Sequence, residues 1–262
     1  MKISLNRKRL ITLFSLIFVA MILVSLLIQR SEEILPRDYP EIQKFGVLNV
    51  SMEYNTSDYY LADDSIVGMQ YELCKYISER SGLDVNILLE NNLGTSIEYL
   101  KNQTVDIIAR NIPVTVENRN ELNFTVPVRK SKQVLIQRKR NPENDSTYIS
   151  NQIQLAHKTI YLPEGSTAIL RIKNLSDEIA EPIYIKEIKE YAQEQILYMV
   201  AFGEIDYAVI DREIALMNQT MFPEIDLHVD ISFTQLQAWA VRKDSPVLLD
   251  SLNIWITEYN LF

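Results

Sequence analysis

Residues 200–212 read "VAFGEIDYAVIDR", and the predicted fold depends on the pattern in this stretch. Gly203 interrupts an apolar helical segment, Asp206 precedes four apolar residues, and Asp211 follows them where a new helical pattern begins. Residues 100–111, "LKNQTVDIIARN", repeat the order of helix end, polar break, aspartate and short apolar run. Such runs between turn residues and helices are typical of buried strands in α/β proteins.

Strands and helices alternate outward from these two stretches. The helix at 67–82 is expected to end at Gly82, and the helix at 95–104 to open at a Thr95 or Ser96 cap. Strands that alternate with helices of this size imply βαβ units and a parallel sheet. Strands are predicted at 46–52, 83–90, 105–112, 158–162, 181–185 and 206–210, and the remaining helices at 165–175, 191–203 and 211–219.

Two long extended segments, 132–140 and 232–246, flank the second group of elements. The chain is therefore expected to cross from one lobe to a second and later to return. The sequence predicts a two-lobed α/β fold joined by two crossover strands, with lobe 1 at 45–133 and 235–262 and lobe 2 at 134–234.

The N-terminus carries an uncharged apolar run of 19 residues at 10–28. At about 1.5 Å per residue it would span roughly 28 Å, which is close to the hydrocarbon thickness of a bilayer. Basic residues within 1–9 place that end in the cytoplasm, and 29–44 is expected to be a juxtamembrane linker. A cleaved signal peptide is the alternative, although the run lacks a small-residue cleavage site.

Composition and motifs exclude several classes of function. The net charge of −9 argues against nucleic-acid partners, which need a basic surface. Glycine-rich nucleotide motifs and the GxSxG hydrolase motif are absent from the sequence. Its two histidines, His157 and His228, lie in unlike contexts, and its single cysteine forms no internal disulfide. We therefore expect no metal and no cofactor.

Asp206 and Asp211 are too far apart to act as a catalytic pair. Five residues of strand separate them by ~16 Å, whereas paired glycosidase carboxylates lie roughly 5–9.5 Å apart. Asp211 is at the carboxyl end of its strand, where ligands bind in open parallel sheets, and could hold a ligand ammonium group. A helix N-cap is the alternative role for Asp211. Ser166 and Thr167 stand at a helix entrance, where free N–H groups and hydroxyls suit a carboxylate.

Taken in order, the motifs of residues 41–258 resemble the bacterial extracellular solute-binding proteins of family 3, a periplasmic binding-protein type II fold. The motifs are "GVLNVSMEYN", "GMQYELCKYISERSG", "LKNQTVDIIARNIPVT", "LPEGST", "GEIDYAVIDREIA" and "WAVRKDSPVLLDSLNIWI". The resemblance implies two hinged lobes that close over a ligand. It also implies that Asp211 binds an amino-acid ammonium group and that Ser166 and Thr167 bind its carboxylate. The loop Tyr54–Tyr59 would supply a wall, with Tyr54, Asp58 and Tyr59 as candidate contacts.

On the opposite wall of the expected ligand site, the sequence departs from the family pattern of Thr-x-x-Arg, in which the arginine binds the ligand carboxylate. Counting from Thr115, residue 118 is Asn118, and Arg119 follows one place later. Arg110 or Arg119 could supply the missing cation, and Asn111 occupies a position that is usually serine. An amino acid, a peptide, a muropeptide or no small ligand all remain open.

The anchor and this version of the lobes look most similar to the N-terminal domain of the membrane-bound lytic murein transglycosylase F proteins. The resemblance implies a single-pass protein of the bacterial inner membrane, with residues 30–262 in the periplasm. We expect no enzyme activity, because the chain ends at Phe262 before a lysozyme-like domain. The predicted function is a binding domain that senses, regulates or assists transport, with peptidoglycan or a membrane protein as a further partner. The alternative is the regulatory part of a transglycosylase-like enzyme.

Overall fold

The computed structural model describes residues 16–21, 37–141, 146–189 and 191–261. Of the expected anchor at 10–28, only residues 16–21 are described, and they are helical; the rest of that segment lies outside the described residues. Within the described ranges, none of the helices combines the length and the apolar character needed to cross a membrane. Residues 37–261 lie in one compact unit, to which the following description refers.

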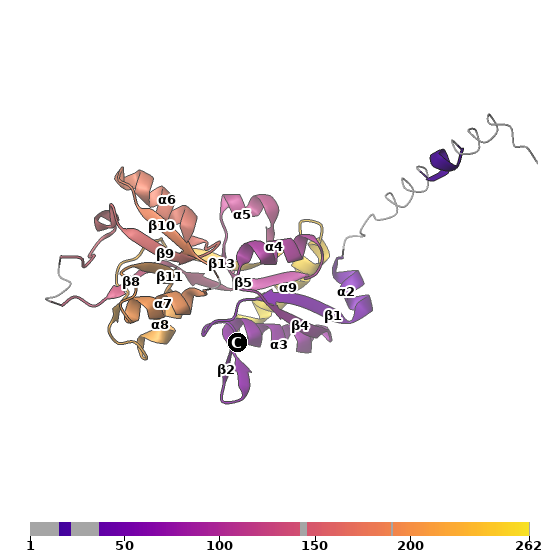
Figure 1. The fold of residues 1–262 in the computed structure, drawn as a ribbon. Helices are drawn as coiled ribbons and strands as arrows, with labels where there is room; N and C mark the ends of the chain where they lie inside the picture. Colours follow the sequence, from indigo (N-terminus) through magenta and orange to yellow (C-terminus); the bar gives the residue numbers. More distant parts are fainter. Residues whose placement is uncertain (1–15, 22–36, 142–145, 190, 262) are drawn as a thin grey trace, which may run out of the picture. The chain divides into compact units, whose positions relative to one another are not determined.

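The unit has two lobes, each built around its own mixed sheet (Figure 1). In lobe 1 the strand order is β4-β1-β5-β13-β6, and β7 also pairs with β13. The order in lobe 2 is β10-β9-β11-β8-β12. The lobe 1 strands are β1 Val47–Met52, β4 Asp84–Leu89, β5 Ile107–Pro113, β6 Asn123–Phe124, β7 Arg129–Ser131 and β13 Gln235–Val241. Those of lobe 2 are β8 Gln133–Arg138, β9 Thr159–Pro163, β10 Tyr184–Ile188, β11 Ala208–Asp211 and β12 Ile225–Asp226.

Each sheet is mixed, whereas the sequence predicted a parallel sheet. Strands β4, β1 and β5 are parallel, as are β10, β9 and β11. The two strands that follow the crossings, β8 and β13, run antiparallel to β11 and β5. A strand that arrives from the other lobe enters its sheet from the end at which the parallel strands finish, so it must run in the opposite direction.

Helices cover both faces of each sheet, because each sheet has an apolar cluster on either side. In lobe 1, α2, α3 and α9 bury Ile42, Leu73 and Leu252 on one face, and α4 buries Leu100 on the other. Lobe 2 packs α6 on one face, and α7 and α8 on the other. The helices are α2 Tyr39–Phe45, α3 Met69–Ser81, α4 Leu93–Lys101, α5 Val116–Glu121, α6 Ala168–Ile179, α7 Gln193–Ala201, α8 Arg212–Gln219 and α9 Pro246–Tyr259. The hairpin β2 Tyr60–Ala62 and β3 Ser65–Val67 and the short 3-10 helix η1 Gln152–Leu155 complete the fold.

Local signals explain several helix ends. Gly82 has a left-handed conformation at the end of α3, as predicted. The predicted cap of α4 is wrong: the Asn92 side chain accepts from Thr95 N, while the Ser96 hydroxyl accepts from the Ser51 hydroxyl in the interior. Asparagine is as good a cap as serine, and a cap lies outside the helical periodicity that locates the helix.

Part of the expected linker at 29–44 belongs to the folded unit. Tyr39–Phe45 forms α2, and Ile42 is fully buried in the lobe 1 core. Arg37 binds the buried Asp106 at 2.7 Å, and Arg242 reaches the same carboxylate at 3.2 Å. A buried carboxylate needs such partners, so this cluster fastens the first described residues of the unit to β5 and β13.

Candidate functional site

The cleft between the lobes contains three adjoining cavities, of about 440, 30 and 140 Å³, which we call the first, middle and third. The first and middle cavities share Gln133 and the loop before α6, residues 165–167, which we call the α6 entrance. The middle and third share Glu53, Asn91, Pro163 and Glu164. Strand ends of both lobes therefore line adjoining cavities, at the place where ligands bind in open α/β sheets.

Asp211 lies at the end of β11 and lines the middle cavity. Its carboxylate does not cap α8; instead it accepts from Gln193 Nε2 at 3.3 Å, while Asp211 N donates to Gln193 Oε1 at 2.7 Å. Burial raises the pKa of Asp211 to about 6, with help from the carboxylates of Asp58 and Glu213 and against the hydrogen bond from Gln193. The carboxylate faces the cavity with a neutral amide as its partner, and the N-cap alternative does not describe it.

Asp206, at the other end of the same segment, is an exposed surface residue. Its carboxylate pairs with Arg138 of β8 at 2.8 Å and lines none of the three cavities. The two aspartates thus have separate partners, consistent with the exclusion of a catalytic pair.

Glu53 follows β1 directly and lines the middle and third cavities. It is 6% exposed and accepts from Arg110 at 2.7 Å, while Arg110 also donates to the Asn91 carbonyl at 3.1 Å. Burial raises the pKa of Glu53 to about 7, because the cost of desolvating the charge exceeds the attraction of Arg110 and nearby Asp58 and Asp211 add repulsion. Arg110, a predicted ligand contact, thus forms an ion pair with Glu53 and lines none of the three cavities.

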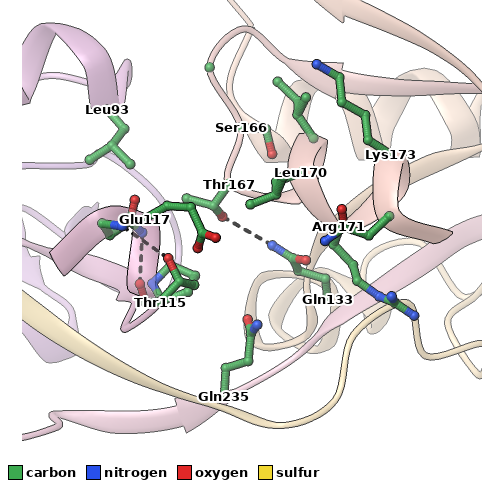
Figure 2. A pocket seen from close by; sticks show the side chains of 15 residues that line it. Leu93, Thr115, Glu117, Gln133, Ser166, Thr167, Leu170, Arg171, Lys173 and Gln235 are labelled. Carbon is green, nitrogen blue, oxygen red and sulfur yellow. Dashed lines mark hydrogen bonds between the residues drawn. The ribbon is translucent and has the colours of Figure 1, made fainter. Parts of the chain in front are cut away.

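The α6 entrance lines the first and middle cavities, as expected for Ser166 and Thr167. The Ser166 hydroxyl accepts from Ala168 N at 3.2 Å, and the Thr167 hydroxyl accepts from Gln133 Nε2 at 3.1 Å (Figure 2). Gly165 N donates to the Glu187 carboxylate at 3.0 Å. Gly165 N is therefore engaged within lobe 2, whereas the Ser166 and Thr167 hydroxyls act in these bonds as acceptors.

The opposite wall of the first cavity comes from the start of α5. Thr115 caps α5 by accepting from Asn118 N, and Asn118 Nδ2 donates to the Pro113 carbonyl at 2.9 Å. Glu117 reaches into the cavity from this side (Figure 2). Arg119 is exposed and lines none of the three cavities, so the structure does not bring it to the position of a carboxylate clamp.

The loop after β1 was predicted to form a wall of the ligand site. Asp58 is buried and accepts from Asn111 at 2.9 Å, which fixes the loop against β5. Tyr59 packs edge-on against Tyr71 at 5.6 Å, and Tyr54 is about half exposed. Tyr54, Asp58, Tyr59 and Asn111 line none of the three cavities.

The same loop forms a direct bond between the lobes. Thr56 donates from its N and its hydroxyl to Glu194 of α7, at 2.7 and 3.0 Å, and Asn218 of α8 donates to the Thr56 hydroxyl at 3.1 Å. Burial raises the pKa of Glu194, and the two bonds from Thr56 oppose that shift. These contacts hold the two lobes together across the cleft.

Sequence reasoning missed Glu53, Gln133, Gln193 and the Thr56–Glu194 contact. Glu53 had a usable signal, because it directly follows a predicted parallel strand just as Asp211 does. The two glutamines had none, since neither their spacing nor their neighbours distinguish them from surface residues.

Comparisons with known proteins agree with this architecture. The model of the bacterial extracellular solute-binding proteins, family 3, matches residues 47–260. The membrane-bound lytic murein transglycosylase F of Aeromonas salmonicida (strain A449) is 27% identical over 203 residues, which are 78% of this chain and 40% of that protein. The protein of the same name from Idiomarina loihiensis is 24% identical over 254 residues, 96% of this chain and 53% of the relative. The chain thus spans about half the length of these curated relatives.

Solved structures share the fold. Holo ArgBP from T. maritima superposes with a TM-score of 0.72 at 22% identity, covering 85% of this chain and 94% of that one. The amino acid ABC transporter substrate-binding protein AbpA from Streptococcus pneumoniae, bound to L-arginine, gives 0.72 at 18% identity, with 85% and 92% covered. At these identities the likeness establishes the two-lobed architecture.

Proposed function

Because this chain belongs to the bacterial extracellular solute-binding proteins, family 3, we propose that it binds a small organic ligand between its two lobes. The candidates are an amino acid, a short peptide or a muropeptide. The observation that supports the proposal is that Asp211, Glu53 and the α6 entrance all line the middle cavity, which shares lining residues with the first and third cavities. The first cavity, at about 440 Å³, is within the range of small-molecule sites.

The proposed mode of action is lobe closure without chemistry. The chain passes between the lobes near Lys132 and again near Phe233, so two short segments act as the hinge. The Thr56–Glu194 bonds are contacts that form only when the lobes meet. In this proposal the protein is anchored in the inner membrane with residues 30–262 in the periplasm, where it senses, regulates or assists transport.

A thermal-shift screen tests the proposal. The full chain is melted with a panel of amino acids, organic amines, short peptides and muropeptides. A ligand at a hundred times its Kd adds about 2.7 kcal/mol of stability, which raises the melting temperature by roughly 5–10 °C for a unit of this size. Asp211→Ala should abolish the shift, and the control Asp206→Ala, on the exposed end of the same segment, should leave it intact. A ligand that shifts Asp211→Ala as strongly as the unchanged protein would show that the site is elsewhere.

A second candidate follows from the curated relatives. The proteins similar to this chain carry the name of a glycan-cleaving enzyme, and the chain spans about half their length. The alternative proposal is therefore a regulatory domain whose ligand controls lytic activity supplied by another segment or another protein. Release of soluble fragments from purified peptidoglycan by this chain alone would contradict the non-enzymatic proposal. A ligand-dependent effect on a lytic transglycosylase added in the same assay would favour the regulatory one.

A further inference from the structure

We propose that the cleft selects a ligand that carries an ammonium or guanidinium group but no carboxylate beside it, that is, an organic amine rather than an α-amino acid. This inference rests on the proposed function, because it takes the interlobe cleft as the ligand site and concerns only the chemistry of what binds there.

The first observation is the charge of the middle and third cavities. Their acidic lining consists of Glu53, Glu90, Glu164 and Asp211, and no lysine, arginine or histidine of the described residues lines either cavity. Arg110 compensates Glu53, and the exposed Lys189 lies 3.5 Å from Glu164. Asp211 forms no ion pair within the described part of the chain. A positively charged group entering here would neutralise a carboxylate that now has only an amide partner.

The second observation is that three backbone N–H groups at or next to the α6 entrance are already engaged. Gly165 N donates to Glu187, Ser166 N to the Pro163 carbonyl, and Ala168 N to the Ser166 hydroxyl. A ligand carboxylate would have to displace these bonds, including one to a protein carboxylate. Among the described contacts of the entrance, the donors left for an anion are the Thr167 N–H and the hydroxyls of Ser166 and Thr167.

The third observation is the orientation of the charged groups in the first cavity. Arg171 donates to the Ile231 carbonyl at 2.8 Å and to Glu178 at 2.6 Å, so its guanidinium turns away from the space (Figure 2). Lys173 is exposed at the rim, whereas Glu117 points inward from the opposite wall. A carboxylate in this cavity would meet an acid and no arginine directed at it.

These observations act together on one ligand. An ammonium placed at Asp211 gains a charge-assisted hydrogen bond, whereas a carboxylate next to that ammonium loses its hydration without gaining a cation. The neutral remainder of an amine can instead occupy the first cavity, which Leu93, Ile169 and Leu170 also line.

Matched pairs of compounds test this inference by isothermal titration calorimetry on the full chain. The pairs are agmatine against L-arginine, 1,5-diaminopentane against L-lysine, and 1,4-diaminobutane against L-ornithine, each differing by one carboxylate. L-arginine amide extends the arginine pair by masking the carboxylate and retaining the α-ammonium. We expect at least one decarboxylated or amidated compound to bind at least about tenfold more tightly than its parent amino acid. Amino acids that bind as tightly as all of their partners, or more tightly, would overturn the inference.

Two substitutions test which residues set the preference for an amine. Asp211→Asn should weaken binding of the best amine at least about tenfold, while the control Asp206→Asn leaves it unchanged. Asn118→Arg places a guanidinium beside the first cavity and should improve the affinity of the parent amino acid relative to its amine. Unchanged selectivity in a correctly folded Asn118→Arg protein, verified by circular dichroism, would contradict the inference that a missing cation sets the preference.

The outcomes separate this inference from the proposed function. If amino acids or peptides bind and the amines do not, the proposed function stands and the amine preference is wrong. If no compound of either set, and none of the peptides or muropeptides, binds to the folded chain, the proposed function fails and the inference fails with it.

Discussion

The buried carboxylate of Glu53 makes the stability of the unit depend on pH in an unusual direction. Its pKa is raised from an ordinary 4.5 to about 7, so the folded state binds this proton more tightly than the unfolded state does. The stabilisation that protonated Glu53 contributes is complete when the pH is below the pKa of the unfolded state. It is lost as the pH rises through the pKa of the folded state. Between about pH 5.5 and about pH 8 the loss is about 2 kcal/mol from Glu53 alone.

Urea denaturation at both pH values measures this loss. For a slope of about 3 kcal/mol per molar, the midpoint should fall by roughly 0.7 M because of Glu53. Glu53→Gln, which resembles the protonated side chain, should lack this component, and comparison with the unchanged protein cancels the other titrating groups, including the histidines. Glu121→Gln, at an exposed surface ion pair, is the control and should retain it. Equal pH dependence of the unchanged protein and Glu53→Gln would refute the reasoning.

Three further substitutions probe other parts of the unit. Asp106→Ala leaves two arginine side chains without their carboxylate and should cost about 3–5 kcal/mol in chemical denaturation; a loss below about 1 kcal/mol would show that other partners suffice. Gly68→Ala would place its Cβ 2.3 Å from the Asp58 carbonyl oxygen, at a residue with a positive φ of 136°. The melting temperature should therefore fall sharply, and an unchanged melting temperature would contradict the close approach. Thr56→Ala removes a hydroxyl that binds Glu194 across the cleft and should increase the radius of gyration of the ligand-free protein in small-angle X-ray scattering, whereas an unchanged radius would show that other contacts hold the lobes.

The fold could be predicted because its information is local. The apolar runs that became β5 and β11 are bounded by polar breaks and helices, and their lengths leave few other arrangements. The antiparallel direction of β8 and β13 could not be read in the same way, because it depends on which end of the sheet the returning chain enters.

The residues that line the cleft could be predicted only where their place follows from their position in the fold. Asp211, Ser166 and Thr167 face the cleft because strand and helix ends must do so. Arg110 and Asp58, both predicted as ligand contacts, are bonded in the structure to their tertiary neighbours Glu53 and Asn111. Those neighbours are distant in sequence, and no spacing rule connects them.

The contact between α2 and α9 has a mechanical consequence. Asp38 accepts from Val247 N and Leu248 N, and Tyr39 packs edge-on against Trp255 at 5.6 Å. The first and last described segments of the unit are thus fastened to each other on lobe 1, and lobe 2 is a loop inserted between them. Tension applied to residues 37 and 261 would act on these contacts between the start of the unit and α9. The two proposed hinge segments would carry none of that force. If the lobes close as proposed, lobe 2 would move while the ends of the unit are held in place on lobe 1.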